Sequence, residues 1–404
     1  VLNLVNPENS DGYNPLAHIK NEIDVDVIAN TIMKGQSSEG GGSDPYWDNM
    51  AEMLLKALIY FLKAVRPPEE QNLASCAEMV RAANNSGGGN KLTELMEVLP
   101  YDHPARMNYK SIEIAPEKTY SSILSTLQSK LGKFDSKEIA ELTSTDTINF
   151  EEIGQKKTAV YVISSDTHTA YDFLLTIFFS QMIQQLYDYA DNNGGRLPTQ
   201  TFFILDEFAN IGRVPDFDKK ISTSRSRNIS FSVILQNLDQ LEAVYEKSFE
   251  TIIGNCDTHV FLGSNSQKTV EYFSKALGEK TIMHESKSKS KNKGKEGKSK
   301  STSTSDQIMA RALLTPDELR RFDNDKCIIF VKGLRPVKAE KYYYFKKPMA
   351  NVMAPLEISH NDIGEIERGE WRKYNPYNPY QEGDENSGKA GGVAQSLESL
   401  DQLF

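Results

Sequence analysis

The segment Thr201-Phe202-Phe203-Ile204-Leu205-Asp206-Glu207-Phe208 joins a short apolar run to two adjacent carboxylates. The apolar run predicts a strand that is buried on both faces. Asp206 and Glu207 follow where this strand ends, and ligands of α/β proteins bind at the carboxyl ends of the strands. An acidic turn that closes an ordinary strand has the same pattern. The rest of the chain must therefore separate the two interpretations.

Strands and helices alternate on both sides of this segment. Further strands are predicted at residues 158–163, 229–235, 258–262 and 327–331, and helices at 170–189, 215–226, 238–253 and 268–277. Strands that are apolar on both faces and separated by helices are typical of a mostly parallel sheet covered on both sides. The sequence therefore predicts an α/β fold.

Residues 67–145 interrupt this alternation, because they contain no convincing strand. Their apolar residues have helical spacing over 73–83, 91–98 and 120–131. We therefore predict an all-α domain at 67–145, inserted between two parts of the α/β domain at 1–66 and 146–355.

Two polar segments are predicted to lie outside these domains. Residues 286–305 are almost entirely Lys, Ser, Gly and Thr, and are expected to form a disordered loop. Residues 356–404 are expected to form a flexible tail. Within that tail, the repetitive sequence Tyr374-Asn375-Pro376-Tyr377-Asn378-Pro379-Tyr380 could be a docking motif, but a disordered tail is the simpler interpretation.

The composition is that of an ordinary globular protein, with no indication of stabilising disulfides or metal sites. The net charge is −10, so the molecule as a whole is not a polyanion binder and any nucleic-acid contact must be local. Its three cysteines have no pairing or metal spacing, which suits a reducing cytoplasm. No apolar run approaches the roughly 20 residues that a bilayer span needs.

Four polar residues beyond the strand end could share one site. In P-loop ATPases the first carboxylate of a Walker B pair holds Mg²⁺ through water and the second polarises the attacking water, which suits Asp206 and Glu207. Arg225 or Arg227 could reach a γ-phosphate across a subunit interface, or could form a solvated basic helix end. Gln236 ends the next strand, where it could orient water or simply bond to backbone.

Several segments resemble the type IV coupling proteins, the TraG-type ATPases of conjugation and type IV secretion. They are Leu205-Asp206-Glu207-Phe208-Ala209-Asn210-Ile211-Gly212-Arg213-Val214-Pro215-Asp216-Phe217, Ser224-Arg225-Ser226-Arg227-Asn228-Ile229-Ser230, Ile234-Leu235-Gln236-Asn237, Ile253-Gly254-Asn255-Cys256-Asp257 and Asp11-Gly12-Tyr13-Asn14-Pro15. The resemblance covers roughly residues 1–345 and is most specific over 202–263.

The resemblance implies a RecA-like P-loop NTPase domain that carries an all-α domain. It further implies ATP and Mg²⁺ as cofactors, with Asp206 holding the metal, Glu207 activating water, and Gln236 closing the sensor strand. Arg225 falls at the arginine-finger position, and Arg227 is a further nucleotide contact. The implied assembly is a homo-hexamer on the cytoplasmic side of the inner membrane. Its partners would be single-stranded DNA, a relaxase and the type IV secretion channel.

The sequence departs from this family in one respect, because it has no Walker A loop of the form Gly-x-x-x-x-Gly-Lys-Ser/Thr. Two segments come near this form. In the first, Asn292 stands at the position of the first glycine before Gly297-Lys298-Ser299. In the second, which starts at Gly35, Gly41-Gly42 occupy the positions of Lys-Ser. The chain opens with an apolar strand and no Met. We therefore expect a truncation before or through Walker A that also removes the membrane anchor, and an inactive fragment.

Two other functions fit parts of the sequence. An FtsK/HerA-like DNA translocase belongs to the same superfamily, but the helical insertion at 67–145 speaks against it. A non-catalytic receptor that docks substrate proteins is favoured by the lack of a phosphate-binding loop in this chain. Binding of nucleotide would distinguish a motor from such a receptor.

Overall fold

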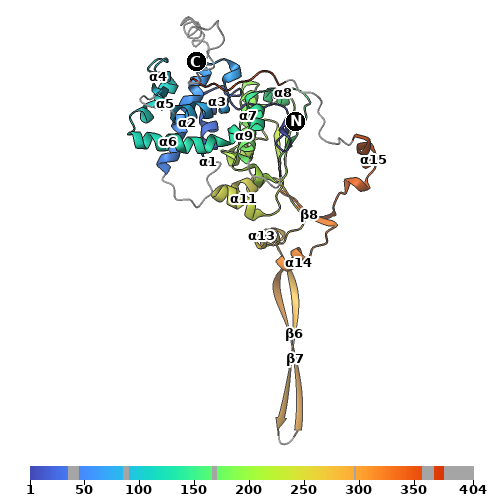
Figure 1. The fold of residues 1–404 in the computed structure, drawn as a ribbon. Helices are drawn as coiled ribbons and strands as arrows, with labels where there is room; N and C mark the ends of the chain where they lie inside the picture. The colour runs from blue at the N-terminus through green and yellow to red at the C-terminus, as the bar shows by residue number, and fades with distance from the viewer. Residues whose placement is uncertain (35–44, 85–90, 166–170, 295–296, 357–367, 377–404) are drawn as a thin grey trace. The chain divides into compact units, whose positions relative to one another are not determined.

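The computed structural model describes residues 1–34, 45–84, 91–165, 171–294, 297–356 and 368–376, with only the backbone described over 284–307. Two compact units are present. The first comprises Val1–Leu205, Asn210–Ser232 and the described part of the C-terminal stretch from Ile358. The second comprises Asp206–Ala209 and Val233–Glu357. Figure 1 labels the elements of both units.

Helices dominate the first part of unit 1 (Figure 1). Their bounds are α1 Glu22–Lys34, α2 Pro45–Val65, α3 Leu73–Asn84, α4 Lys91–Met96, α5 Pro104–Glu113, α6 Glu117–Leu131, α7 Lys137–Ser144 and α8 Phe150–Gln155. Helix α2 buries nine apolar residues, and it packs against α5, α6, α1 and α3. Of these four helices, α3, α5 and α6 follow the predicted boundary between residues 66 and 67, whereas α1 precedes it.

The strands of unit 1 are short. Strand β1 (Leu2–Asn3) pairs in parallel with β2 (Val162–Ile163), as the α/β prediction requires. Strand β3 (Thr201–Leu205) lies beside β4 (Ile229–Val233). Helix α9 (Asp172–Asn192), which is buried along most of its length, packs against α8 and α1. Helix α10 (Phe217–Thr223) contacts β4 through an edge-to-face pair of Phe217 and Phe231.

Strand β3 corrects one prediction. The sequence predicts burial on both faces, but burial alternates along the strand: Thr201, Phe203 and Leu205 are buried, while Phe202 is 63 % and Ile204 73 % exposed. Successive strand residues point to opposite faces. Within the described residues, one face of β3 is therefore packed and the other is open.

Unit 2 has a small core around an antiparallel sheet. Strands β5 (Thr258–Phe261), β8 (Lys326–Val331) and β9 (Val337–Glu340) pair in that order. The prediction that the strands near 258–262 and 327–331 join a parallel sheet is wrong, since both of these pairings are antiparallel. Antiparallel strands commonly accompany otherwise parallel sheets. The core comprises Phe261, Val270, Phe273, Leu319 and Ile328.

The helices of unit 2 are α11 Leu238–Tyr245, α12 Phe249–Gly254, α13 Gln267–Leu277, α14 Pro316–Arg320 and α15 Met349–Met353. The single helix predicted at 238–253 is broken between α11 and α12, where Glu246 has a φ of 42°. Side chains cap several helix starts: Asn237 for α11, Ser266 for α13, and Thr315 in a capping box with Glu318 for α14.

The polar segment 286–305 also departs from its prediction. Its backbone forms part of a two-stranded ribbon, β6 (Glu279–Gly294) paired with β7 (Gly297–Ala312) in one continuous antiparallel register (Figure 1). In the sequence, Lys and Ser alternate from Ser286 to Lys291, which is the two-residue period of a strand. A ribbon needs no core of its own to satisfy its backbone, because its two strands hydrogen-bond each other.

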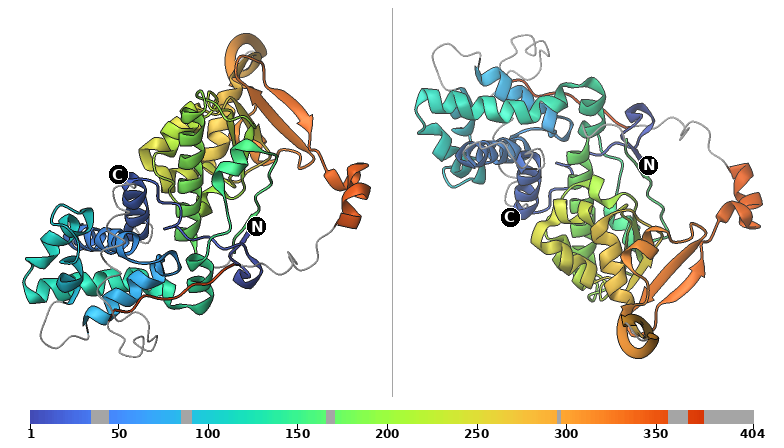
Figure 2. Two further views of the ribbon diagram at one scale, coloured as in Figure 1. Left: turned by 90° about the horizontal axis from the view of Figure 1, so that it is seen from above. Right: turned by 90° about the horizontal axis from the view of Figure 1, so that it is seen from below.

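Within the predicted tail at 356–404, residues 357–367 and 377–404 lie outside the described residues. Residues 368–376 lie in an extended path on the helices of unit 1 (Figure 2). Polar composition alone suggests disorder here, but hydrogen bonds to helix termini hold this segment. No helix in the described part of the chain has the length and apolar character to cross a bilayer.

Candidate functional site

Asp206 and Glu207 form the first turn after β3. Asp206 is exposed and Glu207 is half-buried. The backbone φ of Glu207 is 50°, a value that residues other than glycine seldom adopt. Phe208 fixes the turn: its amide donates to the carbonyl of Ile234 at 3.1 Å, and its buried ring stacks on Tyr245 of α11. An unusual backbone conformation held by its surroundings is common at functional sites.

The structure brings two of the predicted site residues together. The side-chain amide of Gln236 donates a hydrogen bond to Oε1 of Glu207 at 2.9 Å. Both residues belong to unit 2 and both are accessible to solvent. Gln236 therefore orients the carboxylate of Glu207. This contact supports the predicted place of Gln236 beside the Walker B pair, and it argues against a loop residue that bonds only to backbone.

The carboxylate of Asp206 is available to a ligand. It makes no hydrogen bond or ion pair to any residue that the structure describes, and it is exposed. The described residues hold no cluster of three or more His, Cys, Asp or Glu that could form a metal cage. Mg²⁺ is commonly held by one or two carboxylates, with waters and substrate phosphates completing its shell. Asp206 fits that kind of site.

The two predicted arginines, both in unit 1, differ. Arg225 lies in the turn between α10 and β4 with its side chain exposed, and no described residue accepts a hydrogen bond from its guanidinium. Arg227 instead forms an ion pair with Asp191 at 2.9 Å, and its guanidinium lies 4.7 Å from the ring centre of Tyr187, both on α9. This engagement favours a structural role for Arg227, whereas Arg225 is available to a partner.

The segment Asp11–Pro15 is a packing motif. Tyr13 is fully buried, its hydroxyl donates to Oε1 of Gln181 at 2.5 Å, and its ring meets Phe178 edge-to-face. Burial raises the pKa of Tyr13 well above its usual value, and the nearby Asp146 charge acts in the same direction. A Cβ at Gly12 would lie 2.4 Å from Oγ1 of Thr145. This motif joins the start of the chain to α9.

Gly212, in the block that follows the Walker B pair, also has a packing role. Its φ is 82°, and a Cβ there would lie 2.6 Å from Oγ1 of Thr176. That same hydroxyl donates to the carbonyl of Ile211 at 2.6 Å. The glycine therefore lets the loop approach α9 closely.

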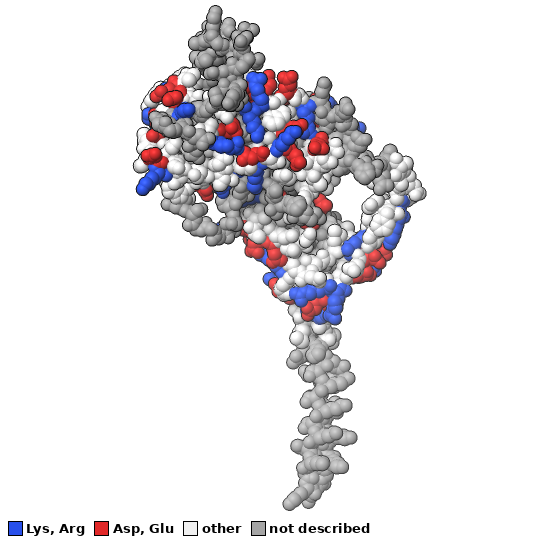
Figure 3. Space-filling view, in the orientation of Figure 1, with Lys and Arg blue, Asp and Glu red and all other residues white. Residues whose placement is uncertain are grey.

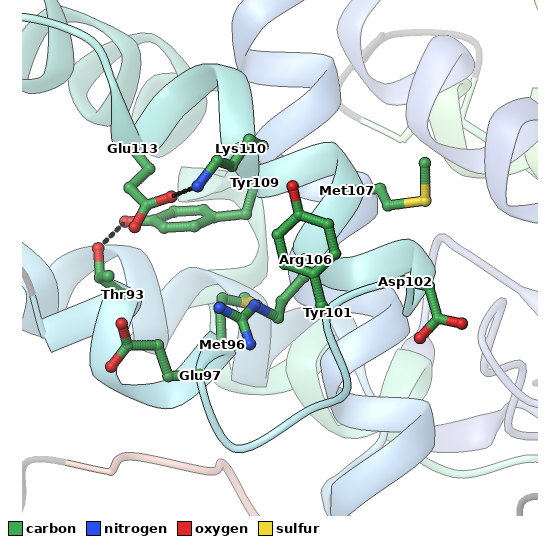
Figure 4. A pocket seen from close by; sticks show the side chains of 10 residues that line it. All are labelled: Thr93, Met96, Glu97, Tyr101, Asp102, Arg106, Met107, Tyr109, Lys110 and Glu113. Atoms are coloured by element: carbon green, nitrogen blue, oxygen red, sulfur yellow. Dashed lines mark hydrogen bonds and ion pairs between the residues drawn. The ribbon is translucent and has the colours of Figure 1, made fainter.

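A pocket of about 270 Å³ lies in the helical part of unit 1 (Figure 4). No sequence pattern indicated it, because its lining comes from two short helices and the loop between them. Hydrogen bonds between Thr93 and Tyr109 and between Lys110 and Glu113 order its wall (Figure 4). The lining residues are Thr93, Met96, Glu97, Tyr101, Asp102, Arg106, Met107, Tyr109, Lys110 and Glu113.

Acidic and basic side chains are interspersed over the described helices on the face that Figure 3 shows. A protein that attracts polyanions over a wide face gathers Lys and Arg there. The described residues of this face carry both signs of charge, which agrees with the net charge of −10. On this face, a contact to nucleic acid would have to be local.

The family of the chain follows from comparison with known proteins. Residues 1–365 match the family model described as type IV secretory system conjugative DNA transfer. The chain belongs to this family. The match favours a coupling protein over an FtsK/HerA-like translocase.

Curated relatives agree with this assignment. Protein VirD4 of Rhizobium rhizogenes is 26 % identical over 218 residues, covering 54 % of this chain and 31 % of VirD4. Conjugal transfer protein TraG of Rhizobium radiobacter is 24 % identical over 342 residues, covering 81 % of this chain and 50 % of TraG. The coupling-protein chain thus spans between about a third and a half of the length of these relatives.

Solved structures establish the fold. The conjugative coupling protein TrwB in its unbound form superimposes with a TM-score of 0.59 at 15 % identity, covering 85 % of this chain and 75 % of that one. A structure of TrwB in complex with ADP and Mg²⁺ has the same TM-score and coverage. The coupling-protein chain therefore has the predicted RecA-like P-loop NTPase fold with a helical domain.

Proposed function

We propose that this chain is the hydrolytic part of a coupling-protein motor, which uses ATP to deliver relaxase-bound single-stranded DNA to a type IV secretion channel. The hydrogen bond from Gln236 to Glu207 carries the proposal, because it orients a carboxylate directly after a strand end. The family of the chain and the TrwB complex with ADP and Mg²⁺ support it.

The residues of the loop divide the chemistry between them. Asp206 would hold Mg²⁺, and the ion would supply charge neutralisation at the nucleotide phosphates. Glu207 polarises the attacking water, and Gln236 keeps the Glu207 carboxylate in one orientation. Both carboxylates are accessible to solvent, so water can reach them.

Arg225 acts on the active site of a neighbouring subunit. Its exposed guanidinium, unpaired within the described part of the chain, would stabilise the charge that develops on the transferred phosphoryl group. This role requires an interface between subunits, and we propose that a homo-hexamer on the cytoplasmic side of the inner membrane provides it.

The test uses the full-length protein, with the 404-residue chain measured beside it. ATP hydrolysis with and without single-stranded DNA and binding of a fluorescent ATP analogue are measured for wild type and Glu207→Gln. We expect Glu207→Gln to lower the hydrolysis rate by about 10²–10⁴-fold, because a general base is lost, with binding retained.

Glu250→Gln on α12 is the control, since Glu250 is a solvent-exposed glutamate of the same unit as Glu207. It should leave hydrolysis and binding unchanged. Undiminished hydrolysis in Glu207→Gln would overturn the assignment of the base. Failure of the full-length wild type to bind nucleotide would favour the docking receptor instead.

A further inference from the structure

Residues 368–376, which we name the C-terminal strap, run in an extended path along α2, the turn Pro68–Glu70 and α3 (Figure 2). Its backbone is bound like that of a peptide ligand. The amide of Arg372 donates to the carbonyl of Glu69 at 3.0 Å, and the carbonyl of Arg372 accepts from Nδ2 of Asn72 at 3.1 Å. The amide of Tyr374 donates to Oγ of Ser75 at 2.9 Å.

The groups that bind this backbone are built into the helical unit. Asn72 and Ser75 are both fully buried, and Oδ1 of Asn72 accepts from the amide of Ser75 at 2.8 Å. Asn72 thus caps the start of α3 with its oxygen and holds the strap with its nitrogen. Buried polar groups need hydrogen-bond partners. Asn72 and Ser75 have some of these partners near the start of α3, and the strap supplies the others.

A buried carboxylate selects the arginine of the strap. The side chain of Glu70 is only 5 % exposed, and it forms ion pairs with Arg66 on one oxygen and Arg372 on the other. Burial would raise the pKa of Glu70, but hydrogen bonds from Arg66 and Arg372 and their charges hold the pKa below its usual value. A buried charge of this kind is stabilised only while its partners are present.

Two further side chains of the strap have their own contacts. The guanidinium of Arg66 lies 4.2 Å from the ring centre of Tyr374, and the Phe61 ring stacks on the same tyrosine with centres 6.2 Å apart. Nδ2 of Asn375 donates to Oε1 of Glu78 at 2.8 Å. The surface between α2 and α3 therefore recognises the side chains of the pattern Arg372-x-Tyr374-Asn375.

The other end of the strap is anchored separately. Arg368, whose side chain is 10 % exposed, donates through Nε to the carbonyl of Ser10 at 3.0 Å and through Nη2 to that of Glu8 at 2.9 Å. Gly369, with a φ of 82°, turns the chain between this anchor and Arg372. Both anchors lie in unit 1, so the chain returns to unit 1 after the whole of Val233–Glu357.

We propose that the α2–α3 surface made by Arg66, Glu70, Asn72, Ser75 and Glu78 is a peptide-binding site for the pattern Arg-x-Tyr-Asn, and that the strap of the same chain is its resident, exchangeable ligand. A tethered ligand acts at an effective concentration of the order of millimolar. The site is therefore filled without needing high intrinsic affinity, and an external peptide with the same pattern enters only when the strap is released.

The pattern also fixes the register of the strap. Tyr-Asn-Pro occurs at 374–376 and again at 377–379, but an arginine stands two residues before Tyr374 and an asparagine two residues before Tyr377. Since Glu70 pairs with that arginine, only the first repeat satisfies the buried carboxylate. Recognition is thus assigned to Arg372 together with Tyr374.

The test uses the 404-residue chain and a fluorescently labelled synthetic peptide of residues 366–378, with binding measured by anisotropy. The double substitution Arg372→Ala/Tyr374→Ala removes the strap side chains but leaves the site intact. We expect it to bind the peptide at least about tenfold more tightly than the wild-type chain does, because competition from the tether is lost. Glu370→Gln, an exposed strap residue, should behave as wild type.

Two further measurements guard against misfolding and non-specific binding. A labelled peptide with alanine at its Arg and Tyr positions should not bind the strap variant. The chain has two tryptophans, so in a Trp47→Phe background the emission of Trp371 reports the strap alone, and it should shift to longer wavelength in the double variant. Equal peptide affinity for wild type and double variant, or an unchanged Trp371 emission, would overturn the proposal.

Discussion

The segments Asp11–Pro15 and Asp206–Glu207 carry the same family resemblance in opposite physical surroundings. Tyr13 is fully buried, and its hydroxyl and ring both have partners on α9. Asp206 is exposed, and among the described residues Glu207 accepts a side-chain hydrogen bond at one oxygen only, from Gln236. A resemblance in sequence therefore does not by itself distinguish a residue that packs from a residue that reacts.

Burial and bonding supply that distinction. A buried and fully bonded motif is expected to control stability, and an exposed acidic motif at a strand end is expected to control chemistry. The two arginines of the Ser224–Ser230 segment divide in the same way, since Arg227 is held by Asp191 while Arg225 is free of partners among the described residues. Each substitution below tests one side of this division.

The largest effect is expected for Arg225→Ala in the full-length protein. Loss of an arginine that stabilises transition-state charge should lower the ATPase rate by about 10³–10⁵-fold. The free energy of unfolding should stay within about 0.5 kcal/mol of wild type, because the side chain is exposed. Steady-state hydrolysis and urea denaturation measure the two quantities.

Arg227→Ala is the matched control for Arg225. It should cost stability through the lost contacts to Asp191 and Tyr187 while the rate remains within a few-fold of wild type. Mixing Arg225→Ala with Glu207→Gln subunits should restore part of the hydrolysis, because an intact pair forms at some interfaces. No restoration would argue against action across an interface.

Gly12→Ala should give the largest loss of stability on the buried side. The new methyl group would lie 2.4 Å from Oγ1 of Thr145 and 2.8 Å from its carbonyl oxygen, so the backbone must move. Overpacking of this kind costs about 1–3 kcal/mol, measurable by urea denaturation. Gly132→Ala, whose methyl would meet no atom within 4 Å, should not destabilise the chain. Equal effects at the two glycines would contradict the packing role of the motif.

Tyr13→Phe should have a smaller effect, because the ring stays and only the hydroxyl is lost. Oε1 of Gln181 would lose its donor inside the core, although its Nε2 keeps a hydrogen bond to the carbonyl of Pro15 at 3.0 Å. We expect a loss of about 1–2 kcal/mol in the free energy of unfolding. Phenylalanine at the exposed Tyr101 serves as the control, and a similar loss there would sink this interpretation.

The sequence predicts the Walker B turn well because its signals are local. An apolar strand followed by two carboxylates needs only neighbouring residues, and Gln236 lies shortly after the end of the very next strand, β4. The hydrogen bond between Gln236 and Glu207 follows from that placement, since adjacent strands bring their ends together. The conformation of Glu207 does not follow, because nothing in its residue type favours a positive φ.

Long-range contacts account for what the sequence does not predict. The strap residue Tyr374 meets Ser75 across 299 positions, and its polar neighbours suggest disorder when read alone. Strand β8 pairs with β5 in an antiparallel register that no local pattern encodes. The sequence also does not predict that Phe202 and Ile204 lie on an open face of β3, because every residue of the run is apolar.

The smallest effect on stability is expected for Asp206→Asn, and it sharpens the contrast with Gly12 and Tyr13. The carboxylate has no partner among the described residues, so its loss should change the free energy of unfolding by less than about 0.5 kcal/mol. The same substitution in the full-length protein should weaken the dependence of hydrolysis on Mg²⁺, so that more Mg²⁺ is needed for half-maximal rate. Titration of Mg²⁺ beside urea denaturation separates the two outcomes. A stable variant with unchanged Mg²⁺ dependence would remove Asp206 from the site, while a strongly destabilised one would place it among the packing residues.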